Sequence, residues 1–98
     1  MSDAQLQTMV QAALDDAAGR SKREVSALVV ASAERVMWSD GSLGCPQPGM
    51  GYTQALVPGY RIRIQAGSET LEYHASARGK PFYCAPSNIT APTRDPRI

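Results

Sequence analysis

Apolar and polar residues follow two different periods along this chain, and the change of period divides it into elements. Near the N-terminus the apolar side chains recur every three or four positions, which is typical of an amphipathic helix. They are Leu6, Met9, Val10, Ala13, Leu14 and Ala17. Ser2 and Gln5 have the spacing of a capping box, and Gly19 stands where a left-handed residue often ends a helix. The pattern predicts an N-terminal helix with one face to bury.

The later segments follow a period of two, which predicts strands. The β-branched run from Val25 to Trp38 indicates a long strand with a bulge near Ser32. Residues 60–66 and 70–75 alternate apolar and polar side chains, and Gly67 between them supplies the glycine that a tight turn requires. These two segments are therefore expected to form an antiparallel hairpin.

The alternation also assigns the two faces of the hairpin. Tyr60, Ile62 and Ile64 are expected to face the helix together with Leu71 and Tyr73. Arg61 and Arg63 then meet Glu72 and His74 on the outer face. The expected fold is α+β, with one N-terminal amphipathic helix on a three- to four-stranded antiparallel sheet in two layers.

The C-terminal part is expected to contribute one short element and a tail. The segment 81–84 can form an edge strand, because Pro81 is compatible with an edge or with the first residue of a strand. Residues 1–84 are thus predicted to be a single α+β domain. Residues 85–98 are rich in proline and polar side chains, which predicts a mobile or extended tail.

A long glycine- and proline-rich stretch joins the first predicted strand to the hairpin. Between Trp38 and Tyr60 there are five glycines, three prolines, one cysteine and three aromatic residues. This composition excludes a regular helix, yet it is too apolar for a flexible linker. Loops of this length in a small domain are often functional. We expect an ordered, packed loop that carries the working surface.

Length and charge restrict the classes of partner. A chain of 98 residues holds one domain, and its net charge of +1 gives no broad basic surface for nucleic acid or for an anionic membrane. No apolar run is long enough to span a bilayer. The start lacks the features of a signal peptide, which predicts a cytoplasmic protein, or a periplasmic or envelope one if an export segment has been removed.

The cysteines, the histidine and the loop glycines are the residues that could carry chemistry. Two cysteines and one histidine are too few for a structural zinc site, so no metal is expected. The loop glycines lack the Gly-Lys-Ser/Thr ending of a phosphate loop, and no cofactor is expected. Cys45 and Cys84 are either a disulfide, worth about 4 kcal/mol in the chain-entropy model, or two reduced, packed thiols.

A resemblance rests on three runs of residues. They are Trp38 to Gly49, Tyr52 to Tyr60, and Leu71 to His74. Together they resemble an uncharacterised family of small bacterial proteins and lipoprotein-like domains, over roughly residues 25–84. The resemblance implies kinship without an established activity. The order of elements is also distantly similar to that of PepSY-like domains, which are associated with protease regulation.

Two functional hypotheses follow from different classes. The first is a non-enzymatic binding module that presents the loop from Ser39 to Pro58 to a protein or peptide, in one version a protease. The candidate binding residues are Trp38, Asp40, Leu43, Pro46, Gln47, Pro48, Met50, Tyr52 and Gln54. The second is a thiol-dependent enzyme with Cys45 as nucleophile and His74 as base. A homodimer joined through an edge strand is compatible with either hypothesis.

Overall fold

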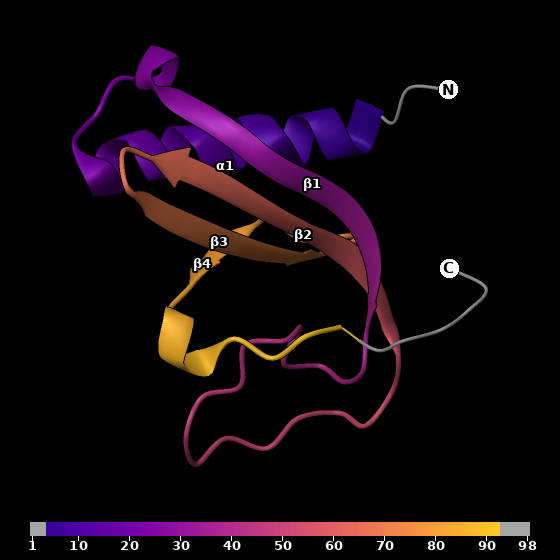
Figure 1. Ribbon diagram of the computed structural model, residues 1–98. Coiled ribbons are helices and arrows are strands. Elements are labelled where there is room, and N and C mark those ends of the chain that lie inside the picture. Colours follow the sequence, from indigo (N-terminus) through magenta and orange to yellow (C-terminus); the bar gives the residue numbers. More distant parts are fainter. Residues whose placement is uncertain (1–3, 93–98) are drawn as a thin grey trace.

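Four antiparallel strands form one sheet, and a single helix packs on it (Figure 1). The computed structural model describes residues 4–92. The helix is α1 (Ala4–Ser21), and the strands are β1 (Leu28–Trp38), β2 (Val57–Ala66), β3 (Glu69–Ser76) and β4 (Phe82–Cys84). Their order in the sheet is their order in the chain, and every pair is antiparallel. The predicted α+β fold is confirmed, with four strands.

The predicted apolar stripe of α1 is the face that packs on the sheet. Met9, Ala13 and Ala17 are buried, and Leu6, Val10 and Leu14 pack around them. Across from the helix lie the buried residues of the hairpin, namely Tyr60, Ile62, Ile64, Ala66, Leu71, Tyr73 and Ala75. Each fully buried isoleucine or leucine of this set contributes about 1.5 to 3 kcal/mol. The core therefore lies between α1 and β2–β3, as the alternation predicts.

The first turn of α1 is bound to the sheet by a side chain. Ser2 of the predicted capping box lies outside the described residues, and the side-chain amide of Gln5 donates to the backbone oxygen of Ala77. Ala77 follows β3, so this bond ties the first turn of the helix to the sheet.

The end of α1 was predicted wrongly. Gly19 lies inside the helix, which continues to Ser21, and Lys22 takes the left-handed conformation with φ of 57°. The hydroxyl of Ser21 donates to the backbone oxygen of Ala17 at 2.7 Å, which supports the last turn. One glycine is tolerated near a helix end because it weakens the helix by only about 1 kcal/mol.

The first predicted strand is shorter than its sequence pattern. Val25–Ala27 form a short 3₁₀ helix, η1, and β1 begins at Leu28. The predicted bulge is present, because the register with β2 shifts between Val30 and Ser32. The extra residue inverts the alternation of side chains between the two faces of the sheet. As a result, Trp38 points away from α1.

The hairpin of β2 and β3 has the predicted tight turn, which consists of Gly67 and Ser68. Gly67 has φ of 64°, and a Cβ there would lie 2.5 Å from the guanidinium of Arg23. On the far face from α1, the strand register places Arg61 opposite His74 and Arg63 opposite Glu72. This placement confirms the predicted meeting of the four side chains. The prediction missed that Glu72 and His74 are buried there.

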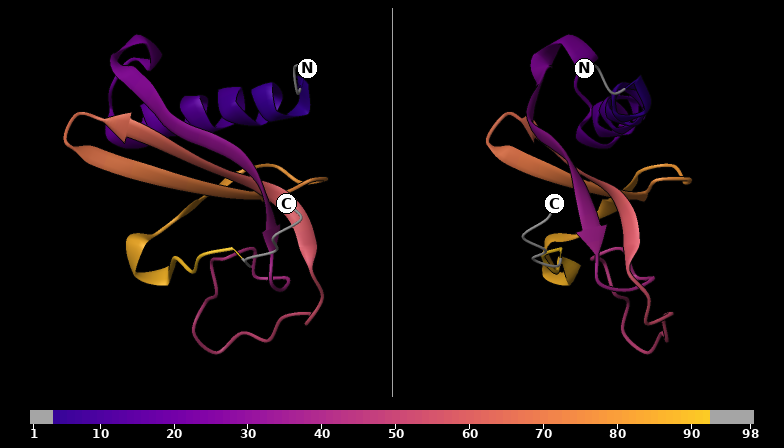
Figure 2. Two further views of the ribbon diagram at one scale, coloured as in Figure 1. Left: turned by 45° about the vertical axis from the view of Figure 1, so that its right-hand side comes forward. Right: turned by 90° about the vertical axis from the view of Figure 1, so that its right-hand side faces the viewer.

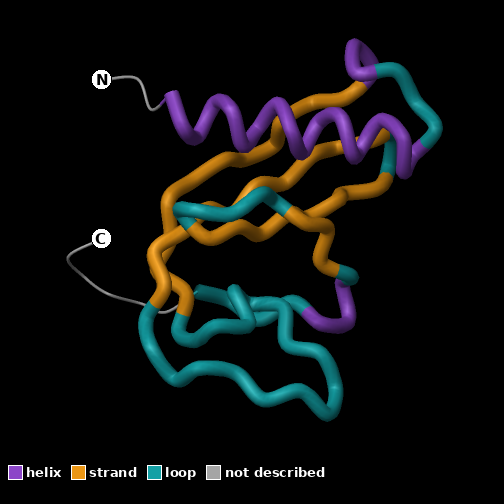
Figure 3. Tube along the Cα trace, turned by 180° about the vertical axis from the view of Figure 1, so that it is seen from behind, coloured by secondary structure: helices purple, strands orange, loops and turns teal. Residues whose placement is uncertain are grey.

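The long loop and the segment after β4 cover part of that far face (Figure 2). Figure 3 shows the loop gathered at one end of the sheet, beside the chain that follows β4. That chain includes a second short 3₁₀ helix, η2 (Pro86–Asn88), and the N–H of Thr90 donates to the oxygen of Gly44 at 2.8 Å. The proposed boundary at residue 84 stays a prediction, and residues 93–98 of the predicted tail lie outside the described residues.

The helices of residues 4–92 include none that is both long and apolar enough to cross a membrane.

Candidate functional site

The loop base, residues 39–45, opens with a turn closed by a side chain. The Asp40 carboxylate accepts a hydrogen bond from the Ser42 hydroxyl at 2.5 Å and another from the Ser42 N–H at 2.8 Å. These two bonds hold the pKa of the Asp40 carboxyl below its usual range, because both favour the ionised form. Asp40 therefore has a structural role in shaping the loop.

A second tight turn follows directly and requires a left-handed backbone at two residues. Leu43 has φ of 54° and Gly44 has φ of 72°, and the N–H of Cys45 donates to the oxygen of Ser42 at 3.0 Å. A Cβ on Gly44 would lie 2.3 Å from the Trp38 ring, so only glycine fits. A left-handed leucine is strained by about 1 kcal/mol. The strain at Leu43 points to a specific contact that offsets it.

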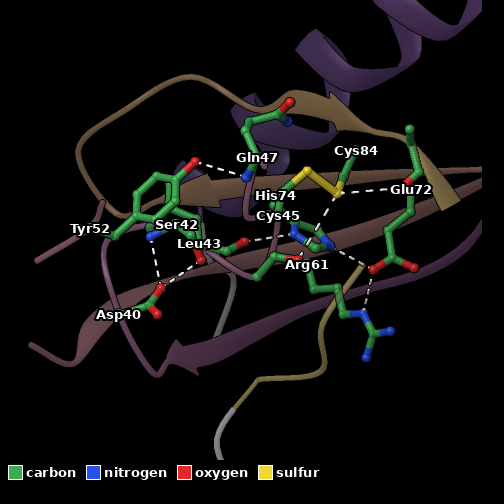
Figure 4. Close-up of a disulfide and its surroundings, with 12 residues drawn as sticks. Asp40, Ser42, Leu43, Cys45, Gln47, Tyr52, Arg61, Glu72, His74 and Cys84 are labelled. Atoms are coloured by element: carbon green, nitrogen blue, oxygen red, sulfur yellow. Dashed lines mark hydrogen bonds and ion pairs between the residues drawn. A yellow bond between two sulfur atoms is a disulfide. The ribbon is translucent and has the colours of Figure 1, made fainter. Parts of the chain in front are cut away.

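That contact comes from His74 on β3. Its Nδ1 donates to the backbone oxygen of Leu43 at 2.7 Å, and its Nε2 lies 2.6 Å from Oε2 of Glu72. The ring of Trp38 stacks on the imidazole with centroids 4.4 Å apart, and its Nε1 donates to the oxygen of Ala75 at 3.0 Å. His74 is completely buried. The loop base thus rests on an aromatic and charged layer of the sheet (Figure 4).

Glu72 joins this layer to β2. Its Oε2 also accepts from Nε of Arg61 at 2.9 Å, and its Oε1 accepts from Nε of Arg63 at 3.0 Å. Burial alone would raise the pKa of the Glu72 carboxyl, but the hydrogen bonds from His74, Arg61 and Arg63 outweigh burial and lower it. Glu72 is therefore an anion at neutral pH, and both of its carboxylate oxygens are hydrogen-bonded.

A disulfide fixes the end of the loop base. Cys45 is bonded to Cys84 of β4 with an S–S distance of 2.12 Å and Cα atoms 5.9 Å apart. Figure 4 shows the bridge beside the His74 ring. Together with the bond from Thr90 to Gly44, the bridge ties the loop base to residues 84–90. Of the two states predicted for these cysteines, the structure contains the disulfide.

The loop tip, residues 46–56, extends beyond these contacts. Pro48 and Gly49, with φ of 80° at Gly49, occupy the central positions of a turn that the N–H of Met50 closes on the oxygen of Gln47 at 3.2 Å. This is the arrangement of a type II turn. The hydroxyl of Tyr52 accepts from the N–H of Gln47 at 2.9 Å. The tip therefore has its own internal hydrogen bonds.

The surface of the loop tip is uncharged and partly apolar. The sequence has no charged residue between Asp40 and Arg61. The side chains of Met50 and Leu56 are 63% and 58% exposed. Single exposed apolar residues are common on protein surfaces, but here they share one protruding segment.

The predicted binding residues fall into three groups by exposure. Pro46, Gln47, Pro48, Met50 and Gln54 are exposed, whereas Asp40, Leu43 and Tyr52 are half-buried. Trp38 is completely buried, so it supports the loop and offers no surface to a partner. Sequence reasoning missed the carbonyl of Leu43 and the contact of Thr90 with Gly44, because a backbone acceptor and a late polar residue leave no pattern in the sequence.

The thiol-enzyme hypothesis requires a free Cys45 thiol beside His74, and the disulfide removes that thiol. The loop base does bring both residues to one layer, but the sulfur of Cys45 is bonded to Cys84 and offers no thiolate. Both nitrogens of His74 are engaged by Leu43 and Glu72. Among residues 4–92, no group of three or more His, Cys, Asp or Glu side chains could hold a metal ion.

The fold and this site define a class of small α+β domain, in which an antiparallel meander carries a helix on one face and a disulfide-bonded loop on the other. Within that class, the chain belongs to a family described as a domain of unknown function, DUF8738, whose profile matches residues 10–84. No curated protein and no solved structure matches the chain significantly. The membership agrees with the predicted kinship to an uncharacterised family, and the similarity to PepSY-like domains stays a prediction.

Proposed function

We propose that the protein is a non-enzymatic binding module that presents the loop from Ser39 to Pro58 to a protein or peptide partner. The observation that carries the proposal is the contrast between the two parts of the loop. The base is held by the disulfide, by His74 and by Thr90. The tip is exposed, uncharged and apolar at Met50 and Leu56.

A loop held in this way loses little conformational freedom when a partner binds. Ordering a mobile side chain at an interface costs about 0.5 to 1.5 kcal/mol, and ordering a loop adds to that cost. Here the type II turn at Pro48 and Gly49 and the bond from Gln47 to Tyr52 fix the shape beforehand. Preorganisation of this kind supports recognition by the loop tip.

The chemistry of the tip suggests its partner. A surface without charge at Pro46, Gln47, Pro48 and Met50 complements an apolar cleft that carries few hydrogen-bonding groups. The active-site cleft of a protease is one cleft of this kind, and a proline-stiffened loop beside a disulfide resists the rearrangement that cleavage needs. The protease-inhibitor version of the hypothesis therefore remains part of the proposal.

The disulfide supports a location in an oxidising compartment. Disulfides persist in secreted and periplasmic proteins and are rare in a reducing cytoplasm. The bridge between Cys45 and Cys84 thus favours the periplasmic or envelope location over the cytoplasmic one.

The test compares three forms of the full chain in affinity capture from an extract of the source cells. Met50→Ser with Leu56→Ser removes the apolar groups of the tip, and Val29→Ser is the matched control, because Val29 is an equally exposed apolar residue on β1. We expect a partner that the wild type and the control retain and that the double variant loses at least tenfold. Identical captured proteins for all three forms would refute the proposal.

The protease version has its own measurement. Purified protein is incubated with a panel of serine and cysteine proteases, and residual protease activity and the cleavage of the loop are followed together. We expect inhibition of one class with slow cleavage, and loss of inhibition in the Met50→Ser, Leu56→Ser variant. Rapid cleavage within residues 46–56 by every protease would exclude this version while leaving other partners open.

A further inference from the structure

The hydrogen bonds of His74 define its protonation state. A backbone carbonyl and an ionised carboxylate only accept hydrogen bonds. Because Nδ1 faces the oxygen of Leu43 and Nε2 faces Oε2 of Glu72, both nitrogens must donate. The ring is therefore an imidazolium, although it is completely buried.

The surroundings of the ring contain one group that stabilises this charge and two that oppose it. On β3 itself, Glu72 is the counter-ion, whereas Arg61 and Arg63 of β2, which also bind Glu72, are cations that repel a positive ring. From β1, the face of Trp38 stacks on the ring, and from β4, Phe82 contacts it with centroids 6.4 Å apart. Two further carboxylates belong to this side of the sheet: Glu34, opposite Arg61, and Asp40, which is bonded to Ser42.

The two protons of the ring are not equivalent. The bond from Nε2 to Glu72 joins two charged groups, and bonds of this type are roughly twice as strong as neutral ones. The bond from Nδ1 to Leu43 ends on a neutral carbonyl. When the ring loses one proton, the proton that remains is therefore the one on Nε2, and the unprotonated Nδ1 then faces the carbonyl oxygen.

We propose that His74 is a pH-sensitive latch on the binding loop: the doubly protonated ring holds the Leu43 turn, and loss of the Nδ1 proton at higher pH releases it. The turn is ready to move because Leu43 is held in a left-handed conformation that a leucine disfavours. The release is local, since the disulfide at Cys45 still holds the end of the loop base. The effect on partner binding rests on the proposed function of the loop.

The latch can be tested in the isolated protein, because the chain has a single histidine. Long-range ¹H–¹⁵N NMR spectra of the full chain are recorded between about pH 5 and about pH 9, the range in which histidine titrates. We expect both ring nitrogens to be protonated at the lower end, and Nδ1 alone to lose its proton at the upper end. A neutral ring protonated on Nδ1, or a ring with one proton throughout, would overturn the proposal.

Amide exchange in the same samples reports the turn. The N–H of Cys45 closes the turn, and the N–H of Ala77, bonded to Pro58 at 2.9 Å, is the reference at another site. After correction for intrinsic exchange, we expect exchange at Cys45 to rise about fivefold relative to Ala77 as the ring titrates, the factor that one hydrogen bond supplies. An unchanged ratio would show that the ring does not control the turn.

Two glutamate variants separate the latch from general electrostatics. Glu72→Gln removes the charge that retains the Nε2 proton, so we expect the neutral ring to keep Nδ1 protonated and the turn to stay closed at high pH. Glu34→Gln removes the other carboxylate opposite Arg61, and the tautomer should not change. If Glu72→Gln does not fold, the wild-type spectra still decide the question.

The consequence for binding is measured separately. The partner found by affinity capture is retained at about pH 6 and about pH 8, and we expect wild-type retention to fall at the higher pH while Glu72→Gln shows no such change. If the loop-tip variants capture the same proteins as the wild type, the proposed function fails. The ring and amide measurements would then still establish or refute the latch, because they need no partner.

Discussion

At the scale of single residues, Gly59 shows how closely the layers approach each other under the loop. It pairs with Val36 of β1 and Ser76 of β3. A Cβ at this position would lie 2.0 Å from the backbone oxygen of Ala75 and 2.7 Å from Nε1 of Trp38. These two atoms form the hydrogen bond that holds the Trp38 ring over His74. The side chain is excluded by space, since the φ of Gly59 is not in the left-handed region.

Gly59→Ala is therefore expected to destabilise the protein strongly. Forcing a methyl group into this packed position should cost about 3 kcal/mol. Gly51→Ala is the control, because a Cβ at Gly51 meets nothing within 4 Å, and it should change stability by no more than about 0.5 kcal/mol. The free energy of unfolding of both variants is measured by urea titration. Equal values would contradict the close approach at Gly59.

At the scale of elements, the sequence predicted what depends on local period and missed what depends on contact between elements. The apolar stripe of α1 and the alternation in β2 and β3 each predict one buried face. In the structure, the predicted face of the helix and that of the hairpin are both buried. The same alternation cannot show that a loop also covers the outer face of the hairpin. The burial of His74 depends on a loop more than twenty residues earlier in the chain, whose folding no local pattern encodes.

The end of α1 offers a prediction at this scale. Gly19 lies in the helix, its φ is negative, and a Cβ there would meet nothing within 4 Å. Gly19→Ala should therefore stabilise the protein by about 0.5 to 1 kcal/mol, since alanine loses less conformational entropy in a helix. Thermal and urea unfolding measure the change. A loss of stability would mean that the glycine has a role that the described contacts do not show.

The link between β2 and β3 through Glu72 predicts that replacing Glu72 destabilises the protein more at neutral pH than replacing Arg63. Glu72→Gln should cost about 3 kcal/mol, because it removes the anion of a buried ion cluster and leaves its cations without it. Arg63→Gln should cost less than about 1 kcal/mol, since the Arg63 side chain is 42% exposed and water screens its pair. Urea titration of the two variants at pH 7 measures the difference. Similar losses would argue against the burial of the cluster.

The lowered pKa of Glu72 also predicts how the stability of the protein changes in acid. The pKa of the Glu72 carboxyl is lowered in the folded protein from its usual 4.5. The unfolded state therefore binds the proton first, and the stability from Glu72 is complete above about pH 4.5 and is lost as the pH falls through the lowered folded-state pKa. Unfolding measured from pH 7 downward should show this loss in the wild type and a shallower one in Glu72→Gln. Identical acid profiles would contradict the assignment.

At the scale of the whole molecule, the disulfide connects parts that the sheet does not. Cys45 and Cys84 are separated by 39 positions, and β4 pairs with β3 through three residues only. The sequence predicted the bridge as one of two states, because the spacing of two cysteines cannot establish whether their sulfur atoms meet. The loop must fold back over β3 before the sulfurs approach, and that fold-back depends on His74, Trp38 and Gly44 together.

Removal of the bridge should weaken the whole protein and loosen its loop. Cys45→Ser with Cys84→Ser is expected to cost about 4 kcal/mol, the chain-entropy value for a closed segment of this length. Hydrogen exchange should rise in residues 39–58 and 82–90 and change little in α1, whose contacts lie on the other face. Urea titration and exchange of the variant measure both effects. Equal increases throughout the chain would show that the bridge supports the core as well.

The bond from Thr90 to Gly44 has a consequence for the order in which the chain acquires its shape during synthesis. The helix and the first three strands are complete once residue 76 is available, because neighbours in the sheet are neighbours in the chain. The loop is made earlier, yet its base is held only after Cys84 and Thr90 have been made, and both follow the third strand in the chain. The helix and three strands of a nascent chain can therefore assemble before the loop takes its final shape.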